Sequence, residues 1–108
     1  MMEVFEVGTI TIDRVVYTVT KDGYGGRSIL TVVLKNTIPL PNDYNTTVKF
    51  YDRDLVVVSQ QSKTGVLMPL GDVEITFTFE GTSTMAGIEV RRLFIPFIKE
   101  DSRTVYPG

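Results

Sequence analysis

The chain has 108 residues, a net charge of −2, and no histidine, cysteine or tryptophan. This length fits one domain, and the absence of cysteine excludes disulfides, thiolate metal sites and a cysteine nucleophile. Lysines and arginines are scattered, with Arg91 and Arg92 as the single adjacent pair. A nucleic-acid-binding protein needs a basic stripe to replace the counterions on phosphates, so we expect no nucleic-acid partner.

The ends and apolar runs of the sequence bear on its location. The first residues lack the basic start and the apolar stretch of a signal peptide. No apolar run approaches the roughly 20 residues of a membrane helix. We therefore expect neither a signal peptide nor a membrane span in this chain, and the sequence does not indicate where the protein resides.

Short runs of Val, Ile, Thr, Tyr and Phe, broken by Gly, Pro, Asn and Asp, predict strands and turns. No window has the apolar spacing of a helix longer than one turn. The sequence predicts an all-β, immunoglobulin-like β-sandwich of about seven mainly antiparallel strands over residues 1–99, followed by a polar tail at 100–108. The expected strands are Glu3–Asp13, Val15–Lys21, Ile29–Lys35, Thr46–Tyr51, Leu55–Ser59, Asp72–Glu80 and Ile88–Ile98, with a short additional strand at Val66–Met68.

Two features stand out near the N-terminus. The apolar residues of the first strand change from odd to even positions at Gly8, which predicts a kink or a bulge there. The three glycines of the loop Asp22–Ser28 favour a hairpin connection. On the tip of this loop, Tyr24 and Arg27 are candidate contact residues, because both types are enriched in binding hot spots.

Polar segments connect the predicted strands in the middle of the chain. Pro39 and Pro41 are expected to hold the connection at residues 36–45 extended. Asp52 and Asp54 lie two residues apart, but a calcium loop needs more oxygen ligands at a defined spacing. These aspartates are therefore expected to form a turn, and we predict no metal and no cofactor.

The strand Asp72–Glu80 has the clearest alternation in the chain. We expect Val73, Ile75, Phe77 and Phe79 to face the core, and Glu74, Thr76 and Thr78 to face solvent.

The last predicted strand carries apolar side chains on both faces, yet it contains Pro96, which belongs at a sheet edge or a bulge. One interpretation is a bulge at Pro96 that turns both sets of side chains inward. The other is a contact between subunits that covers Phe94 and Ile98, because an apolar edge strand otherwise aggregates. Phe94, Pro96 and Ile98 are therefore candidate interface residues.

Part of the chain resembles the FxLYD-type immunoglobulin-like domains, over about residues 29–79. The matching segments are Leu34-Lys35-Asn36-Thr37, which ends a strand in a Lys-Asn-Thr turn, Val48-Lys49-Phe50-Tyr51-Asp52 at the place of the signature, and Leu70-Gly71-Asp72 before a Phe-rich strand. Of the signature, Tyr51 and Asp52 are kept, while Val48 and Phe50 replace its Phe and Leu. The resemblance implies an immunoglobulin-like fold and carries over no catalytic residue.

These features predict a non-enzymatic structural or protein-interaction module. It would self-associate or belong to a larger assembly such as a virion, a filament or a surface complex. The alternative is a ligand-binding sandwich with a loop-built site, for example for carbohydrate, in which Tyr24 and Tyr44 are the exposed aromatic candidates. A sandwich alone does not decide between them, because function depends on sites grafted onto folds.

Overall fold

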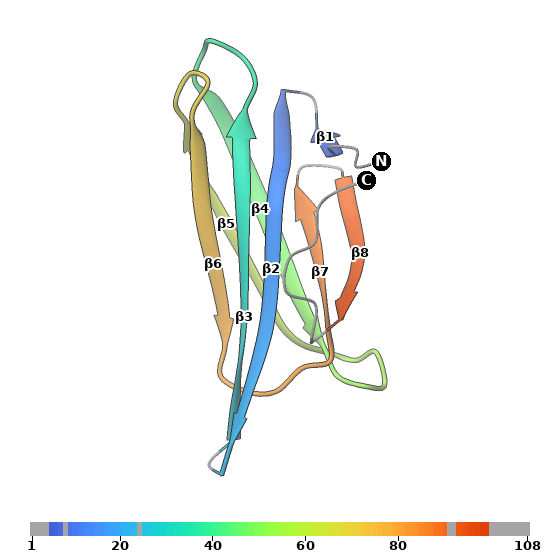
Figure 1. The fold of residues 1–108 in the computed structure, drawn as a ribbon. Helices are drawn as coiled ribbons and strands as arrows, with labels where there is room; N and C mark the ends of the chain where they lie inside the picture. The colour runs from blue at the N-terminus through green and yellow to red at the C-terminus, as the bar shows by residue number, and fades with distance from the viewer. Residues whose placement is uncertain (1–4, 8, 24, 91–92, 100–108) are drawn as a thin grey trace.

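The computed structural model describes residues 5–7, 9–23, 25–90 and 93–99, and these form eight strands and no helix (Figure 1). The strands pair into two antiparallel four-stranded sheets. The prediction of an all-β chain is therefore confirmed, with eight strands in place of about seven. They are β1 (Phe5–Val7), β2 (Ile10–Asp22), β3 (Gly25–Asn36), β4 (Asn42–Tyr51), β5 (Val57–Leu67), β6 (Asp72–Phe79), β7 (Met85–Val90) and β8 (Leu93–Lys99).

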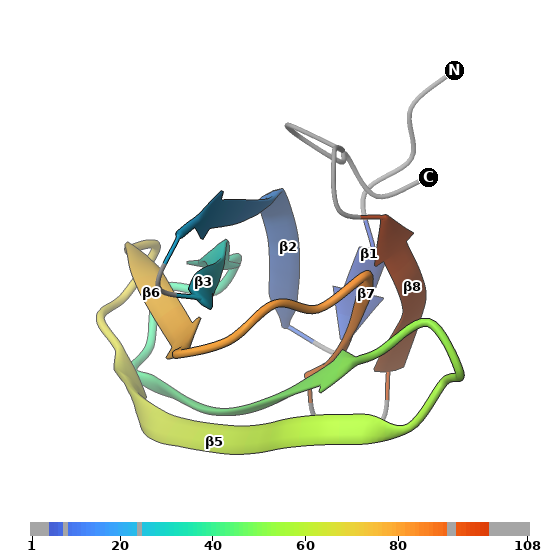
Figure 2. The same ribbon diagram turned by 90° about the horizontal axis from the view of Figure 1, so that it is seen from below.

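The two sheets face each other as the layers of a sandwich. One sheet has the strand order β1-β2-β3-β6 and the other the order β5-β4-β7-β8. A view along the strands separates β2, β3 and β6 from β5 and β4 (Figure 2). The chain crosses between the sheets after β3, β5 and β6, so each sheet contains strands from both halves of the sequence.

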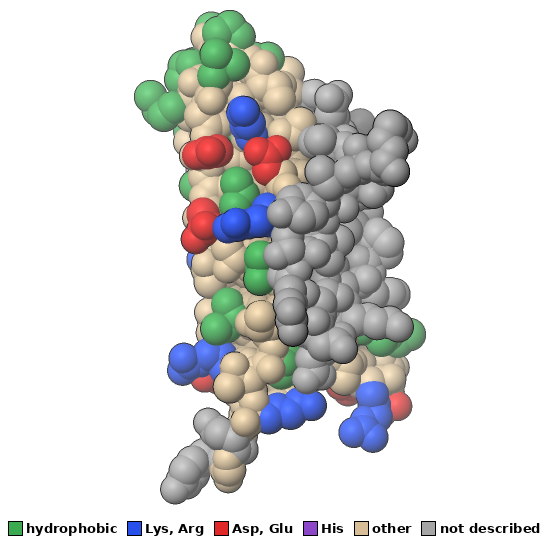
Figure 3. Space-filling model, in the orientation of Figure 1, with side chains coloured by type: hydrophobic (Ala, Val, Ile, Leu, Met, Phe, Trp, Pro, Cys, Tyr) green, Lys and Arg blue, Asp and Glu red, His purple; other side chains and the backbone are tan. Residues whose placement is uncertain are grey.

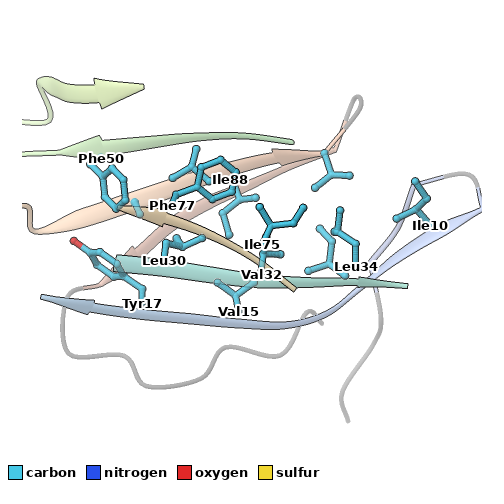
Figure 4. Close-up of a cluster of buried hydrophobic side chains, with 14 of the residues drawn as sticks. Ile10, Val15, Tyr17, Leu30, Val32, Leu34, Phe50, Ile75, Phe77 and Ile88 are labelled. Atoms are coloured by element: carbon cyan, nitrogen blue, oxygen red, sulfur yellow. The ribbon is translucent and has the colours of Figure 1, made fainter. Parts of the chain in front are cut away.

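The core fills the space between the layers, and its described residues come from the inward sides of β2 to β7 (Figure 4). Its largest fully buried side chains include Tyr17, Phe50 and Phe77. The rings of Tyr17 and Phe79 lie 6.2 and 6.0 Å from that of Phe50, so aromatic contacts join the two sheets. In β6, Ile75 and Phe77 are buried, and Val73 and Phe79 pack against the core, while the three intervening residues are exposed. The predicted faces of this strand are therefore confirmed.

The first predicted strand, Glu3–Asp13, is two strands in the structure. β1 and β2 pair antiparallel, with Val7 opposite Ile10, so the chain reverses where a kink at Gly8 was predicted. β2 then runs through Asp13 without a break. The register with β3 shifts at Asp13, which is an extra residue in β2. This bulge changes the parity of the strand and brings Ile12 and Val15 to the same buried face.

The polar middle of the chain contains more strand than the sequence predicted. Residues 60–65, which lie outside the predicted strands, belong to the 11-residue strand β5, and this strand also includes Val66 and Leu67 of the short strand expected at Val66–Met68. Of the residues in β5, Leu67 alone is buried. β5 is an edge strand with both faces exposed to solvent, so its sequence does not alternate between apolar and polar residues. For this reason the periodicity of the sequence did not predict it. Similarly, β4 begins at Asn42 and not at Thr46.

The last predicted strand, Ile88–Ile98, is also two strands. β7 begins at Met85, three residues before the predicted start at Ile88, and β8 pairs antiparallel with it as the edge strand of the sheet. Ile88 and Val90 are buried in β7. The apolar residues that were assigned to two faces, Leu93 to Ile98, all lie in β8, so the conflict with Pro96 concerns this strand alone.

The edges of β5 and β6 meet along one side of the sandwich, where side chains replace backbone pairing. Lys63 of β5 donates from Nζ to the carbonyl of Thr76 at 2.6 Å, and Gln61 donates from Nε2 to the carbonyl of Thr78 at 2.7 Å. The Lys63 ammonium also lies 5.1 Å from the centroid of the Phe77 ring. These contacts give acceptors on the β6 edge a partner within the same chain, which protects the edge from pairing with another strand.

Candidate functional site

The described part of the chain carries an exposed apolar surface at one end of the sandwich. It is formed by the β3–β4 connection, the end of β5 and the β5–β6 connection. Leu40, Val66, Met68 and Leu70 expose 58–69% of their surface here, and we call these four residues the apical surface. Hydrophobic side chains gather at this end above the charged ones (Figure 3). A contiguous exposed apolar patch on a soluble domain is typical of an interaction site.

A buried asparagine holds the apical surface in place. Asn36, which is 0% exposed, donates from Nδ2 to the carbonyls of Leu40 at 2.7 Å and Met68 at 2.9 Å. Its Oδ1 accepts from the backbone N–H of Ile38 at 3.2 Å and from Nδ2 of Asn42 at 3.5 Å. One side chain thus joins the two connections that carry the patch, with its hydrogen-bonding capacity in use.

The turn at Met68–Gly71 holds its second central residue, Leu70, in a strained backbone conformation. The N–H of Gly71 donates to the carbonyl of Met68 at 2.9 Å, and the intervening residues are Pro69 and Leu70. Leu70 has a φ of 55°, the left-handed conformation that a type II turn demands at this position and that normally selects glycine or asparagine. A bulky residue held in this conformation costs about 1–2 kcal/mol, and such strain is concentrated at functional sites.

The strain at Leu70 can be measured. We expect Leu70→Gly to raise the free energy of unfolding by about 0.5–1 kcal/mol, because relief of the strain outweighs the greater chain entropy of glycine. Leu40→Gly is the matched control, since Leu40 is an equally exposed leucine without a positive φ. Leu40→Gly should lower the free energy of unfolding by about 0.5–1 kcal/mol, as measured by urea unfolding. Destabilisation of equal size by both variants would show that Leu70 carries no strain.

A second exposed apolar surface lies at the opposite end of the β4–β5 hairpin. Leu55, Val56, Val57 and Val58 expose 37–56% of their surface, and we call them the basal surface. Asp52 closes this loop: its Oδ1 accepts from the N–H of Asp54 at 2.8 Å and of Val56 at 3.0 Å. Asp52 therefore forms the turn, as predicted. Leu55 has a φ of 64°, so this surface also contains a strained leucine.

The candidate loop contacts lie differently from the prediction. Tyr24 is outside the described residues. Arg27 is exposed, but it belongs to β3 and not to a loop, and its Nε lies 3.1 Å from Oε1 of Glu80 in an ion pair between β3 and the end of β6. Tyr44, the aromatic candidate for a carbohydrate site, lies in β4, and its ring covers Gly65 on the paired strand. Arg27 and Tyr44 therefore lie on strands of different sheets and not in loops, and the carbohydrate alternative stays a prediction.

The candidate interface residues Phe94, Pro96 and Ile98 belong to β8, the edge strand of its sheet. Ala86 pairs with Ile98 and Ile88 with Ile95, so two steps on β7 face three on β8. The extra residue falls at Pro96 or Phe97, which supports the bulge that the proline predicted. The side chains of β8 lie outside the described part of the structure. A contact between subunits through them stays a prediction.

Among the described residues, no three acidic side chains come together to hold a metal ion. Within the same part of the chain, no helix has the length and apolarity needed to cross a lipid bilayer.

The apical and basal surfaces were not predicted, although both left a trace in the sequence. Pro39-Leu40-Pro41 and Met68-Pro69-Leu70 place large apolar residues next to prolines, where an extended connection cannot bury them. Leu55 to Val58 is an apolar run directly after an aspartate turn. Periodicity assigns such residues to strands, and only the fold shows which connections meet at the same end.

Comparisons with known proteins give a likeness of fold. No family model matches the chain, and no curated protein matches it. The structure is similar to the crystal structure, at 1.81 Å resolution, of a DUF1425 family member from Shewanella sp. pv-4. The TM-score is 0.53 and the sequence identity 16%, and the match covers 86% of this chain and 90% of the other. At this identity the likeness concerns the fold alone.

Proposed function

We propose that the chain is a non-enzymatic protein-interaction module that docks through its apical surface. The observation that carries the proposal is the exposure of Leu40, Val66, Met68 and Leu70 on two connections that Asn36 joins from below. Surfaces that are ordered before binding lose little conformational entropy on binding. The patch is therefore suited to a specific contact with an apolar site on protein.

Two further observations support this function. Leu70 occupies a position at which glycine would relieve the backbone, so the large apolar side chain is present at a cost to stability. The sequence contains neither histidine nor cysteine, which removes the commonest general base and the most reactive nucleophile. Both observations favour binding over catalysis.

The fold that we infer for this module is immunoglobulin-like. In immunoglobulin domains strands A, B and E lie in one sheet and C, F and G in the other. β2, β3 and β6 correspond to the first set, and β4, β7 and β8 to the second, in the same chain order. β5, which pairs with β4, takes the place of the additional strand C′ of variable domains.

Photo-crosslinking in the cells that make the protein tests the proposed function. A photoreactive amino acid at position 68 should give adducts with protein, because Met68 lies in the docking surface. The matched control is position 62, since Ser62 is exposed in the middle of β5, the strand that precedes Met68, away from both ends of that strand. Mass spectrometry identifies the adducts. Their absence at position 68, or equal yields at both positions, would overturn the proposal.

A further inference from the structure

We propose that the free edge of β6 is a latent pairing surface for β6 of a second copy, and that Gln61 and Lys63 form a strap that keeps this edge closed. The inference goes beyond the proposed function, because it concerns one side of the sandwich and not the apical surface. β6 is the last strand in the order β1-β2-β3-β6, so β3 pairs with one of its sides and no described strand pairs with the other. β5, the last strand of the other sheet, lies beside this open edge (Figure 1).

The contacts with β5 identify the backbone groups on the edge. The carbonyls of Thr76 and Thr78 accept hydrogen bonds from Lys63 and Gln61, so both carbonyls point away from β3. In an antiparallel strand the N–H and the carbonyl of one residue point to the same side. The N–H groups of Thr76 and Thr78 therefore face the edge as well, and the edge presents donors and acceptors at the spacing that another strand requires.

The sequence of β6 indicates which strand would pair with it. Residues 75–79 read Ile-Thr-Phe-Thr-Phe, a run of β-branched and aromatic residues without charge, proline or glycine. Short segments of this composition pair with identical copies of themselves. Ile75 and Phe77 are already buried in the core, so the backbone edge is the part of the segment that is still able to pair. A second copy of β6 is therefore the partner that fits this edge.

Acidic residues at both ends of the segment limit the register of such a pair. When residues 75–79 of two antiparallel copies overlap completely, Phe77 lies opposite Phe77 of the second copy, and Glu74 lies opposite Glu80. Like charges directly opposite each other destabilise a sheet. A register centred on Ile75 avoids this contact, because it places Glu74 opposite Thr76. The acidic residues therefore weaken the pairing without preventing it, and closure of the edge depends on the strap.

The strap occupies the acceptors that pairing would use. Nζ of Lys63 lies 2.6 Å from the carbonyl oxygen of Thr76, and Nε2 of Gln61 lies 2.7 Å from that of Thr78. The Lys63 ammonium also lies 5.1 Å from the centroid of the Phe77 ring, so a cation–π contact accompanies its hydrogen bond. A hydrogen bond from a charged donor is stronger than one from a neutral donor. An incoming strand must displace both side chains and accept a lysine charge at its edge.

A double variant removes the strap and keeps the apolar stems of its side chains. In Gln61→Met with Lys63→Met, neither side chain donates a hydrogen bond, while methionine still covers Phe77. Sedimentation velocity of the purified full chain should show a sedimentation coefficient that rises more steeply with concentration than that of the wild type. Gln60→Met with Lys49→Met is the matched control, because it makes the same change on the outer face of the same sheet, where these two residues are paired. The control should sediment like the wild type.

Hydrogen exchange identifies the strand that pairs. In the associated strap variant the amides of Thr76 and Thr78 should become protected, whereas in the control they should exchange as in the wild type. Addition of Thr76→Glu to the strap variant should abolish both the association and the protection. The new carboxylate lies opposite Glu74 of the second copy in the register centred on Ile75. Thr47→Glu, which adds the same charge to the outer face of β4, should leave both effects in place.

Two results would overturn the inference: a strap variant that sediments like the wild type, and association that leaves the amides of Thr76 and Thr78 exchanging as before. If the double variant does not fold, as judged by circular dichroism, Lys63→Met alone is compared with Lys49→Met in the same two measurements. Neither result affects the proposed function, because crosslinking at position 68 of the wild type tests the apical surface separately.

Discussion

Phe77→Ala is expected to lower the free energy of unfolding by about 3–5 kcal/mol, the usual cost of removing a fully buried aromatic ring. Phe77 is 0% exposed between the two sheets. A domain of this size has a total stability of about 5–15 kcal/mol, so the variant should be marginally folded. Urea unfolding followed by circular dichroism measures the loss.

The adjacent residue supplies the control. Thr76 points to the solvent side of β6, and its Oγ1 lies 3.1 Å from that of Thr31. Thr76→Ala should cost less than about 1 kcal/mol, because an exposed hydrogen bond is readily replaced by water. Losses of equal size at the two positions would contradict the assignment of the faces. If Phe77→Ala does not fold, the smaller change Phe77→Leu keeps the comparison measurable.

The second large effect is expected at Asn36. We expect Asn36→Ala to lower the free energy of unfolding by about 2–4 kcal/mol. The carbonyls of Leu40 and Met68 lose their hydrogen-bond donor, and removal of the buried amide leaves a cavity. The effect should also be local. Hydrogen exchange at the amide of Leu70, which donates to the carbonyl of Ile38 at 2.9 Å, should accelerate more than exchange in the core strands.

Asn45→Ala is the matched control for this experiment, since Asn45 is an exposed asparagine on β4. It should change stability by less than about 0.5 kcal/mol. Because Asn36 does not contact solvent, loss of crosslinking at position 68 in Asn36→Ala would reflect displacement of the apical surface. Unchanged exchange at Leu70 would show that Asn36 does not hold the two connections together.

The sequence predicts well those elements in which one face is buried and the other is wet. β6 shows this best, because Phe77 and its neighbours alternate without interruption. The same reasoning fails for β5, where both faces are wet, so its hydrogen-bonded pairing with β4 leaves no pattern in the side chains. It also fails at Asp13, since a bulge reverses the alternation inside a continuous strand.

The candidate site was harder to predict than the fold. Asn36 was placed in a turn by its Lys-Asn-Thr context, but its bonds to Leu40 and Met68 join segments more than 25 residues apart in the sequence. The periodicity of a sequence reports local burial and not which connections meet. The left-handed backbone at Leu70 was equally hard to predict from the sequence. A type II turn normally has glycine or asparagine at this position, so a leucine there argues against the turn.

The strand order has a consequence for how the chain reaches this fold. β2 and β3 pair across a tight connection, but the partner of β3 on its other side is β6, with Ser28 opposite Phe79. Likewise, β4 receives β7 only after both β5 and β6 have been made. Pairing between such distant segments is slow, on the scale of milliseconds to seconds for sandwich topologies. During synthesis the edge of β3 that will pair with β6 therefore stays open until residue 79 has left the ribosome. In this interval the nascent chain most needs protection from aggregation with other chains.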